Sequence, residues 1–325
     1  MNITVLGAGA YGLSLALRLS KNKRNNIIIW SKVKDEIDIL NKTHMNEKVL
    51  PNIKFPSKFI YTTNTKKALE GSDIVILAVA TKFLRNVCEE IKPYVNNKHI
   101  VIASKGIERD SNEFASNIVK STLKTKKLCT ISGPSFAKDM AEDELIGLSL
   151  ATTNNKTKEF VLKAFDIDTL KLRVTKDFLG VELCGTLKNV IAIISGMLDS
   201  MKVSESTKAM FLTETINDTK NLIKKLGGNE RTITSYAGFG DILVTCTSSS
   251  SRNYSFGKLI GTNPSKEKID KFLKENTVEG VYTLESIYGL IKSKRVKMPF
   301  IDFVYDVVFS HRKGSDIISF LKEKD

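Results

Sequence analysis

The chain has 325 residues, of which 42% are hydrophobic and 26% are charged, a composition typical of a globular protein with about two domains. Its net charge of +14 does not indicate a nucleic-acid partner, because only nine of the fifty basic residues are arginine and the lysines are spread along the chain as on a solvated surface. No run of about 18 apolar residues occurs, so we expect no membrane span.

The first half of the chain alternates short apolar runs with stretches of helical character. Several of these runs are apolar at every position, which is typical of strands in a parallel sheet that helices cover on both faces. The predicted strands are 2–7, 27–30, 74–79, 100–103, 128–131, 148–152 and 169–174. A series of this kind predicts an α/β domain with a doubly wound, Rossmann-like and mainly parallel sheet.

The character of the sequence changes near Asp177. Residues 178–201 show no strand alternation, are too long for a strand and are apolar on almost every face, which indicates a helix buried inside a domain. The remainder is mainly helical with glycine-rich interruptions. We therefore predict a dinucleotide-binding domain over residues 1–176 and an all-helical substrate domain over residues 177–325.

A glycine fingerprint follows the first predicted strand. Gly7, Gly9 and Gly12 match G-x-G-x-x-G around Ala10 and Tyr11, and an amphipathic helical segment comes next. In this setting Gly7 makes the turn and Gly9 lets the backbone approach a pyrophosphate. Gly12 allows the helix to pack closely on the strand. The pattern therefore predicts a nicotinamide dinucleotide site rather than an empty glycine-rich turn.

The residues that end the second strand bear on the choice of cofactor. NAD enzymes usually carry Asp or Glu there for the ribose 2′-hydroxyl, whereas this chain reads Trp30-Ser31-Lys32. Asp35 and Glu36 come later and are expected to open the next helix. With no carboxylate to repel a 2′-phosphate, the sequence predicts NADP or NAD with NADPH favoured.

Lys188 stands in the middle of the apolar helix. Such a lysine is either a surface residue that extends its chain to solvent or a functional ammonium held in a cleft. A polar cluster follows downstream, with an acid, a hydroxyl, an arginine and an amide near glycines. It comprises Gly240, Asp241, Thr245, Ser251, Arg252 and Asn253. The cluster is either a surface loop or a site for a small anionic substrate.

These residues resemble one known family, the NAD(P)-dependent glycerol-3-phosphate dehydrogenases, over nearly the whole chain. The glycine fingerprint is shared by many dehydrogenases, but the order of the other motifs is far more specific. These motifs are Ser-Lys-Gly-Ile-Glu at 104–108, Ser-Gly-Pro-Ser-Phe-Ala at 132–137, Leu-Lys-Asn at 187–189, Gly-Asp at 240–241, Ser-Arg-Asn at 251–253 and Val-Glu-Gly at 278–280.

The resemblance implies a reaction in which dihydroxyacetone phosphate is reduced reversibly to sn-glycerol 3-phosphate for glycerophospholipid synthesis. Lys188 would be the proton donor and acceptor, with Lys105 and Asp241 as the other catalytic groups. The substrate would contact Lys105, Gly133, Ser135, Lys188, Asn189, Asp241, Thr245, Ser251, Arg252 and Asn253. The cofactor would contact Gly7, Gly9, Ala10, Tyr11, Gly12, Trp30, Ser31, Lys105, Ala137, Arg252 and Glu279.

The resemblance also implies a homodimer, and the sequence departs from the family where it bears on that expectation. Ser206 replaces an Asn, and Glu214 and Thr215 replace an Arg-Gly pair, which puts subunit contacts in doubt more than the chemistry. The four cysteines and three histidines are scattered without metal-ligand spacing, so we predict no metal and a reducing, cytoplasmic compartment.

Two other functions remain open from the sequence. One is a two-domain dehydrogenase that acts on a hydroxy acid with a similar lysine helix. The other is a nucleotide-binding regulator that senses the cofactor ratio without turnover.

Overall fold

The computed structural model describes residues 1–109, 111–310 and 312–323, and the chain forms two compact units. The first unit contains Met1–Lys105 and Phe114–Phe178, and the second contains Gly106–Glu113 and Leu179–Asp325. This division differs from a single boundary at residue 176 because the segment Gly106–Glu113 packs with the helical unit. There, Arg109 forms an ion pair of 2.7 Å with Glu285.

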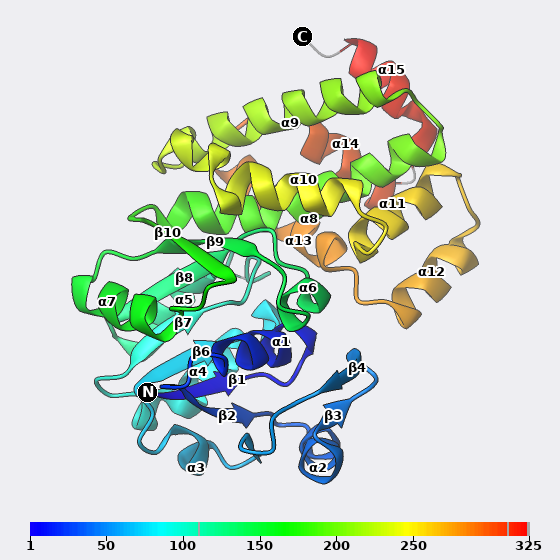
Figure 1. Cartoon of the computed structure of the whole chain (residues 1–325). Coiled ribbons are helices and arrows are strands. Elements are labelled where there is room, and N and C mark those ends of the chain that lie inside the picture. Colours follow the sequence, from blue (N-terminus) through cyan, green and yellow to red (C-terminus); the bar gives the residue numbers. More distant parts are fainter. Residues whose placement is uncertain (110, 311, 324–325) are drawn as a thin grey trace. The chain divides into compact units, whose positions relative to one another are not determined.

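An eight-stranded sheet forms the centre of the first unit (Figure 1). Its strand order is β10-β9-β8-β7-β6-β1-β2-β5, and every neighbouring pair is parallel except β8 and β9. The predicted mainly parallel, doubly wound sheet is therefore confirmed. The strands are β1 (Asn2–Leu6), β2 (Asn26–Trp30), β5 (Ile60–Thr62), β6 (Ile74–Leu77), β7 (His99–Ile102), β8 (Leu128–Ser132), β9 (Ile146–Ala151) and β10 (Leu170–Thr175).

Three short strands between β2 and β6 were not predicted from the sequence. β3 (Met45–Asn46) and β4 (Leu50–Lys54) form a separate antiparallel pair, and β5 is a three-residue edge strand. Most of β4 is exposed or only partly buried, and it carries Pro51 and Asn52. Short, polar, proline-containing segments lack the continuous apolar pattern by which buried strands are recognised.

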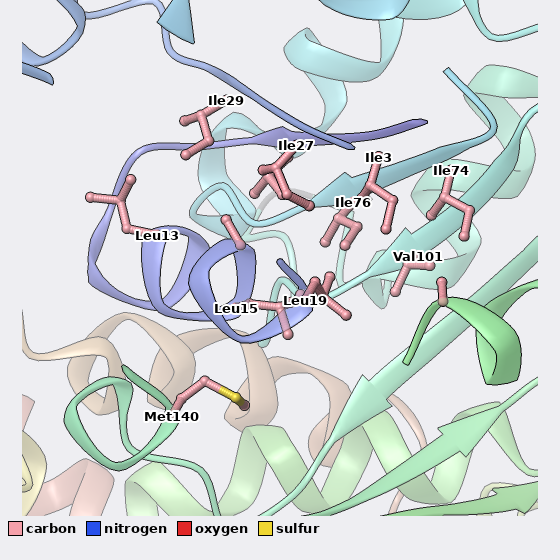
Figure 2. Close-up of a cluster of buried hydrophobic side chains, with 14 of the residues drawn as sticks. Ile3, Leu13, Leu15, Leu19, Ile27, Ile29, Ile74, Ile76, Val101 and Met140 are labelled. Atoms are coloured by element: carbon pink, nitrogen blue, oxygen red, sulfur yellow. The ribbon is translucent and has the colours of Figure 1, made fainter. Parts of the chain in front are cut away.

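Helices cover the sheet on both faces because the central strands are apolar on both faces. One core joins side chains of the sheet to α1 (Ala10–Leu19), α2 (Lys34–Thr43), α6 (Ala137–Ala141) and α7 (Asn155–Ala164). Figure 2 shows Ile3, Ile27 and Ile76 of this core facing Leu15 and Leu19 of α1. The opposite core joins the sheet to α3 (Thr65–Leu69), α4 (Thr81–Ile91) and α5 (Ala115–Leu123).

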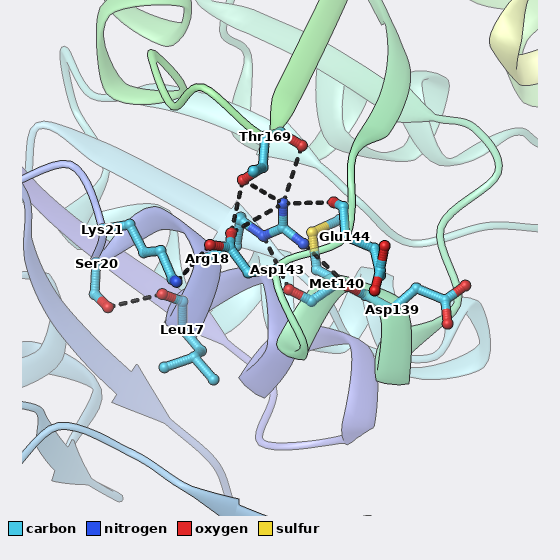
Figure 3. Close-up of polar contacts among 9 residues, drawn as sticks. All are labelled: Leu17, Arg18, Ser20, Lys21, Asp139, Met140, Asp143, Glu144 and Thr169. Atoms are coloured by element: carbon cyan, nitrogen blue, oxygen red, sulfur yellow. Dashed lines mark hydrogen bonds and ion pairs between the residues drawn. The ribbon is translucent and has the colours of Figure 1, made fainter.

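A buried arginine near the C-terminal end of α1 forms hydrogen bonds with α6, with the loop after α6 and with Thr169. The side chain of Arg18 is fully buried, and its guanidinium donates to the backbone carbonyls of Asp139, Met140, Glu144 and Thr169 (Figure 3). It also bonds the hydroxyl of Thr169 at 2.8 Å and lies 3.3 Å from the carboxylate of Asp143. This network fixes α6 and the loop after it against α1.

The second unit is helical and is organised around α8 (Phe178–Ser200), whose described range matches the predicted buried helix closely. α8 is long and apolar enough to span a membrane, but 83% of its most apolar window is buried inside the structure, as in the core helix of a folded domain. The surrounding helices are α9 (Glu205–Lys225), α10 (Asp241–Thr247), α11 (Arg252–Gly261), α12 (Lys266–Glu275), α13 (Glu279–Ser293), α14 (Pro299–Phe309) and α15 (Ile317–Glu323).

Glycines let α8 and α11 approach each other closely. A Cβ atom on Gly257 would lie 1.9 Å from the carbonyl oxygen of Ile193, and one on Gly196 would lie 2.0 Å from that of Tyr254. No side chain larger than hydrogen fits either position. This contact sets the position of Asn253, in the first turn of α11, relative to Asn189 on α8.

Candidate active site

The turn after β1 has the geometry of a dinucleotide-binding loop. Gly7 has a φ of +121°, and a Cβ there would lie 2.5 Å from the carbonyl oxygen of Ala78, so only glycine is tolerated. A Cβ on Gly12 would lie 2.2 Å from the carbonyl oxygen of Gly7, which explains the close packing of α1 on this turn. Gly9 is exposed, and a Cβ there would meet nothing within 4 Å.

These three environments match the roles expected from the sequence. Gly7 makes the turn, Gly12 allows close packing, and Gly9 presents bare backbone to open space. α1 begins at Ala10 without a side-chain cap, so its first-turn N–H groups are not capped by a side chain and can bind an anion. β1 lies between β6 and β2, where the chain order reverses, which is the place where such sheets bind ligands. The turn therefore fits a dinucleotide pyrophosphate.

Other predicted residues of the first unit gather beside this turn. The hydroxyl groups of Tyr11 and Ser135 lie 3.2 Å apart, and Lys105 Nζ lies 5.9 Å from the centre of the Tyr11 ring. Gly133 is buried, and a Cβ there would lie 2.5 Å from the carbonyl oxygen of Gly147. Ala137 is the first residue of α6. The structure thus brings Tyr11, Lys105 and Ser135 together.

The structure at the end of β2 shows that one premise of the cofactor prediction, the absence of a carboxylate there, is wrong. Asp35 and Glu36 do lie in the first turn of α2, as expected, but Ser31 Oγ donates to a carboxylate oxygen of Glu36 at 2.8 Å. A carboxylate is therefore present beside Ser31, because α2 begins so soon after β2 that its first turn folds back to the strand end. Sequence inspection missed it because Glu36 lies six residues beyond Trp30 rather than at the strand end.

Two further residues at this strand end have partners within the protein. The side chain of Trp30 is buried and donates to the carbonyl of Thr63 at 3.1 Å, so its indole N–H is used within the protein. Lys32 Nζ forms an ion pair of 2.5 Å with Glu90, so this cation is neutralised locally.

In the helical unit, Lys188 and Asp241 form a largely buried ion pair. Lys188 Nζ lies 2.5 Å from Asp241 Oδ1, and their side chains are 12% and 1% exposed. Burial at this level excludes the alternative in which Lys188 is an ordinary surface lysine. α8 supplies the lysine, and α10 begins at Asp241, so the carboxylate also lies favourably at a helix N-terminus.

The segment before α10 explains how Asp241 is positioned. Residues Tyr236–Gly240 form a kinked turn in which Gly238 has non-helical backbone angles, and a Cβ on Gly238 would lie 2.1 Å from the carbonyl oxygen of Ile233. Thr245, one turn later, donates to the carbonyl of Asp241 at 2.6 Å. Next to the pair, burial strongly raises the pKa of the Cys246 thiol, with Lys188 acting against that rise. Cys246 therefore remains a neutral thiol.

A chain of hydrogen bonds connects the other predicted residues of this unit. Asn253 Nδ2 donates to Asn189 Oδ1 at 2.9 Å, and the backbone N–H of Gly280 donates to Asn253 Oδ1 at 2.8 Å. Asn189 in turn donates to the carboxylate of Glu279 at 3.4 Å. The two amides therefore hold α8, α11 and α13 together at the predicted site.

Two remaining residues have distinct local settings. Ser251 caps α11 by accepting the backbone N–H of Tyr254 at 3.3 Å. Arg252 is exposed at the first turn of the same helix. The helical unit thus presents a buried ion pair, an amide chain and an exposed arginine at a helix N-terminus.

Comparison with known proteins identifies relatives over the whole chain. The model of the N-terminal part of NAD-dependent glycerol-3-phosphate dehydrogenase matches residues 2–158, and that of the C-terminal part matches residues 177–319. The chain is 33% identical over 327 residues to glycerol-3-phosphate dehydrogenase [NAD(P)+] of Staphylococcus epidermidis, covering 99% of this chain and 98% of that protein. The Bacillus subtilis enzyme of the same name is 34% identical, covering 96% and 91% of the two chains.

Solved structures show the same similarity. The crystal structure of glycerol-3-phosphate dehydrogenase from Coxiella burnetii matches with a TM-score of 0.93 and 27% identity, covering 99% of each chain. Both family models, the curated relatives and this solved structure name the same enzyme family. The chain belongs to the NAD-dependent glycerol-3-phosphate dehydrogenase family.

Proposed function

We propose that the chain catalyses the reversible reduction of dihydroxyacetone phosphate to sn-glycerol 3-phosphate with a nicotinamide dinucleotide. The observation that supports this most strongly is the Lys188–Asp241 pair, in which the largely buried ammonium on the core helix α8 is held by a buried carboxylate at the start of α10. A residue that gives and takes a proton needs this kind of fixed, water-poor setting. The names of the curated relatives supply the substrate.

The proposed chemistry divides between cofactor and protein. When bound, a reduced nicotinamide would supply the hydride for the carbonyl carbon, and an oxidised one would accept the hydride from the same carbon in the reverse reaction. Lys188 donates a proton to the oxygen as negative charge develops on it, and accepts that proton in the reverse reaction. Asp241 holds the ammonium in place, and Lys105 is the other proposed catalytic group.

The substrate phosphate is assigned to the start of α11. Arg252 is exposed there and has the planar fork that binds phosphate through two hydrogen bonds. Both sides of the Asn253 amide already bind protein groups, so Asn253 acts mainly by fixing this helix start. Gly133, Ser135, Asn189, Thr245 and Ser251 complete the proposed substrate site, and Ala137 and Glu279 the cofactor site.

The wider setting is also a proposal. The four cysteines are buried thiols, which suits a reducing cytoplasm. The product would supply glycerophospholipid synthesis, and the family resemblance supports a homodimer.

A substrate panel tests the activity. Purified chain is mixed with NADH or NADPH, and loss of the reduced-nicotinamide absorbance is followed with three carbonyl compounds. Dihydroxyacetone phosphate should be reduced at least about 100-fold more efficiently than dihydroxyacetone, because a charged phosphate contact contributes about 1.5–3 kcal/mol and several donors act together. Faster reduction of a 2-keto acid would instead identify a hydroxy-acid dehydrogenase. Cofactor binding without absorbance change on any substrate would identify a regulator.

A further inference from the structure

Two carboxylates, those of Glu36 and Glu90, lie beside the residues that follow β2, and each binds one of their side chains. Ser31 is buried, and its hydroxyl donates to the carboxylate of Glu36 at 2.8 Å. The Ser31 hydroxyl oxygen also accepts a hydrogen bond from the backbone N–H of Val33 at 3.2 Å. These bonds hold the Glu36 carboxylate, in the first turn of α2, beside the end of β2. Glu36 is half-buried, so its charge is only partly screened by solvent.

The cation that could offset this charge is already engaged. Lys32 Nζ lies 2.5 Å from Glu90, which also accepts a hydrogen bond from the hydroxyl of Thr65. Burial opposes ionisation of Glu90, but the hydrogen bonds from Lys32 and Thr65 outweigh it and lower the pKa of this carboxyl. Glu90 is therefore charged at neutral pH, and the Lys32–Glu90 pair has no net charge.

The remaining charged groups of this segment are exposed. Lys34 and Asp35 are both exposed in the first turn of α2, so solvent screens their charges. Of the described charged residues 32–36, Glu36 is therefore the one whose half-buried charge acts at the end of β2, where dinucleotide-binding folds place the 2′ substituent of the adenine ribose. A carboxylate at that place accepts a hydrogen bond from a 2′-hydroxyl and repels a 2′-phosphate.

We propose that Glu36, anchored by Ser31, is the residue that determines cofactor specificity in this chain and makes it prefer NADH to NADPH. The carboxylate that other dinucleotide-binding folds place at the strand end is here supplied from the first turn of α2. This inference replaces the preference for NADPH that Ser31 and Lys32 suggested when taken alone. It rests on the proposed use of a nicotinamide cofactor, but not on the identity of the oxidised or reduced substrate.

The test measures dissociation constants of NADH and NADPH by their fluorescence on binding to the full chain, alongside kcat/KM with dihydroxyacetone phosphate. The wild-type chain should bind NADH at least about tenfold more tightly. E36Q keeps an acceptor for Ser31 but removes the charge, so NADPH binding should tighten by about tenfold while NADH binding changes by less than about threefold. D35N removes the same charge from an exposed neighbour and should change neither constant by more than about twofold.

The possible results separate this inference from the proposed function. Tighter binding of NADPH by the wild-type chain, or an E36Q variant in which the ratio of the two dissociation constants is unchanged, would overturn the role of Glu36. S31A should reduce the discrimination, since the carboxylate is no longer held. If the binding ratios shift as expected but no cofactor is oxidised by dihydroxyacetone phosphate, the role of Glu36 stands and the proposed reaction fails.

Discussion

Asp241 is 1% exposed, and its carboxylate lies 2.5 Å from Lys188, so each charge depends on the other. Replacing Asp241 by Asn keeps the shape but leaves a nearly buried ammonium without its counter-charge. We expect kcat to fall by about 10²-fold or more. Turnover of D241N within about threefold of wild type would contradict a direct influence of Asp241 on the amine.

Arg252 provides a second prediction at the residue scale. Arg252→Lys keeps the charge but loses the planar fork, so kcat/KM for dihydroxyacetone phosphate should fall by about 30- to 150-fold. Arg295→Lys is the matched control, because Arg295 is exposed outside the proposed site and the change should have no measurable effect. Steady-state kinetics of both variants measure this, and wild-type efficiency in R252K would move the phosphate away from α11.

Single residues also show the limits of sequence interpretation. The turn at Gly7 and the close packing at Gly12 could be predicted because the local pattern determines this geometry. The pairing of Lys188 with Asp241 spans 53 positions, and it came from family resemblance rather than from spacing. Glu36 was misjudged because a hydrogen bond that reaches back to Ser31 depends on where α2 begins.

At the scale of elements, we expect the buried Arg18 network to be the contact that holds α6 against α1. Arg18→Met would leave four backbone carbonyls without their guanidinium donor and Asp143 without one of its cations. We expect the free energy of unfolding to fall by about 3–5 kcal/mol. Arg18→Lys should recover only part of this loss, since a lysine has no planar fork.

Denaturant unfolding measures the effect, with Arg24→Met as the control. Arg24 is exposed, so its replacement should change the free energy of unfolding by no more than about 0.5 kcal/mol. Equal stability of R18M and R24M would show that the buried network contributes nothing net.

The contact of α8 with α11 yields a second prediction at this scale. Gly257→Ala would place a methyl group 1.9 Å from the carbonyl of Ile193, so the helices must separate, at a cost of about 3 kcal/mol. The bond between Asn189 and Asn253 should weaken as they separate, and kcat should fall with it. Both stability and turnover are measured.

Gly289→Ala is the matched control for this prediction. Gly289 lies inside α13, where a Cβ meets only the side chain of Asn112 at an ordinary 3.5 Å, so alanine should stabilise the chain by about 0.5–1 kcal/mol. If both glycine variants gain stability, the close helix contact is not a constraint.

Elements that are buried on most sides have long apolar runs in their sequence, and these elements were the ones that could be predicted. The central strands and α8 are buried on nearly all sides, and their apolar runs located them correctly. β3, β4 and β5 are short and partly exposed, so their sequences carry little pattern.

For the whole molecule, the sequence predicted the change from an α/β unit to a helical one near residue 177. It could not predict that Gly106–Glu113 belongs with the helical unit, because that depends on tertiary contacts such as the ion pair of Arg109 with Glu285. Gly106, where the chain first passes from the α/β unit to the helical unit, has a φ of +121°, a conformation that glycine adopts readily.

The central claim is that Lys188 exchanges the proton in a glycerol-3-phosphate dehydrogenase reaction. The most direct measurement compares turnover of the wild-type chain with that of Lys188→Met, together with cofactor binding and a thermal melt. Methionine occupies the apolar path of the lysine chain, so the variant should fold and bind cofactor. Wild type should consume one reduced cofactor for each glycerol 3-phosphate formed, and K188M should be slower by about 10²–10⁴-fold.

Lys292→Met is the control, because Lys292 is half-exposed and paired with Asp302 outside the proposed site. It should turn over like wild type. A folded, cofactor-binding K188M that retains turnover within about threefold of wild type, far less than positioned acid–base catalysis contributes, would contradict the account.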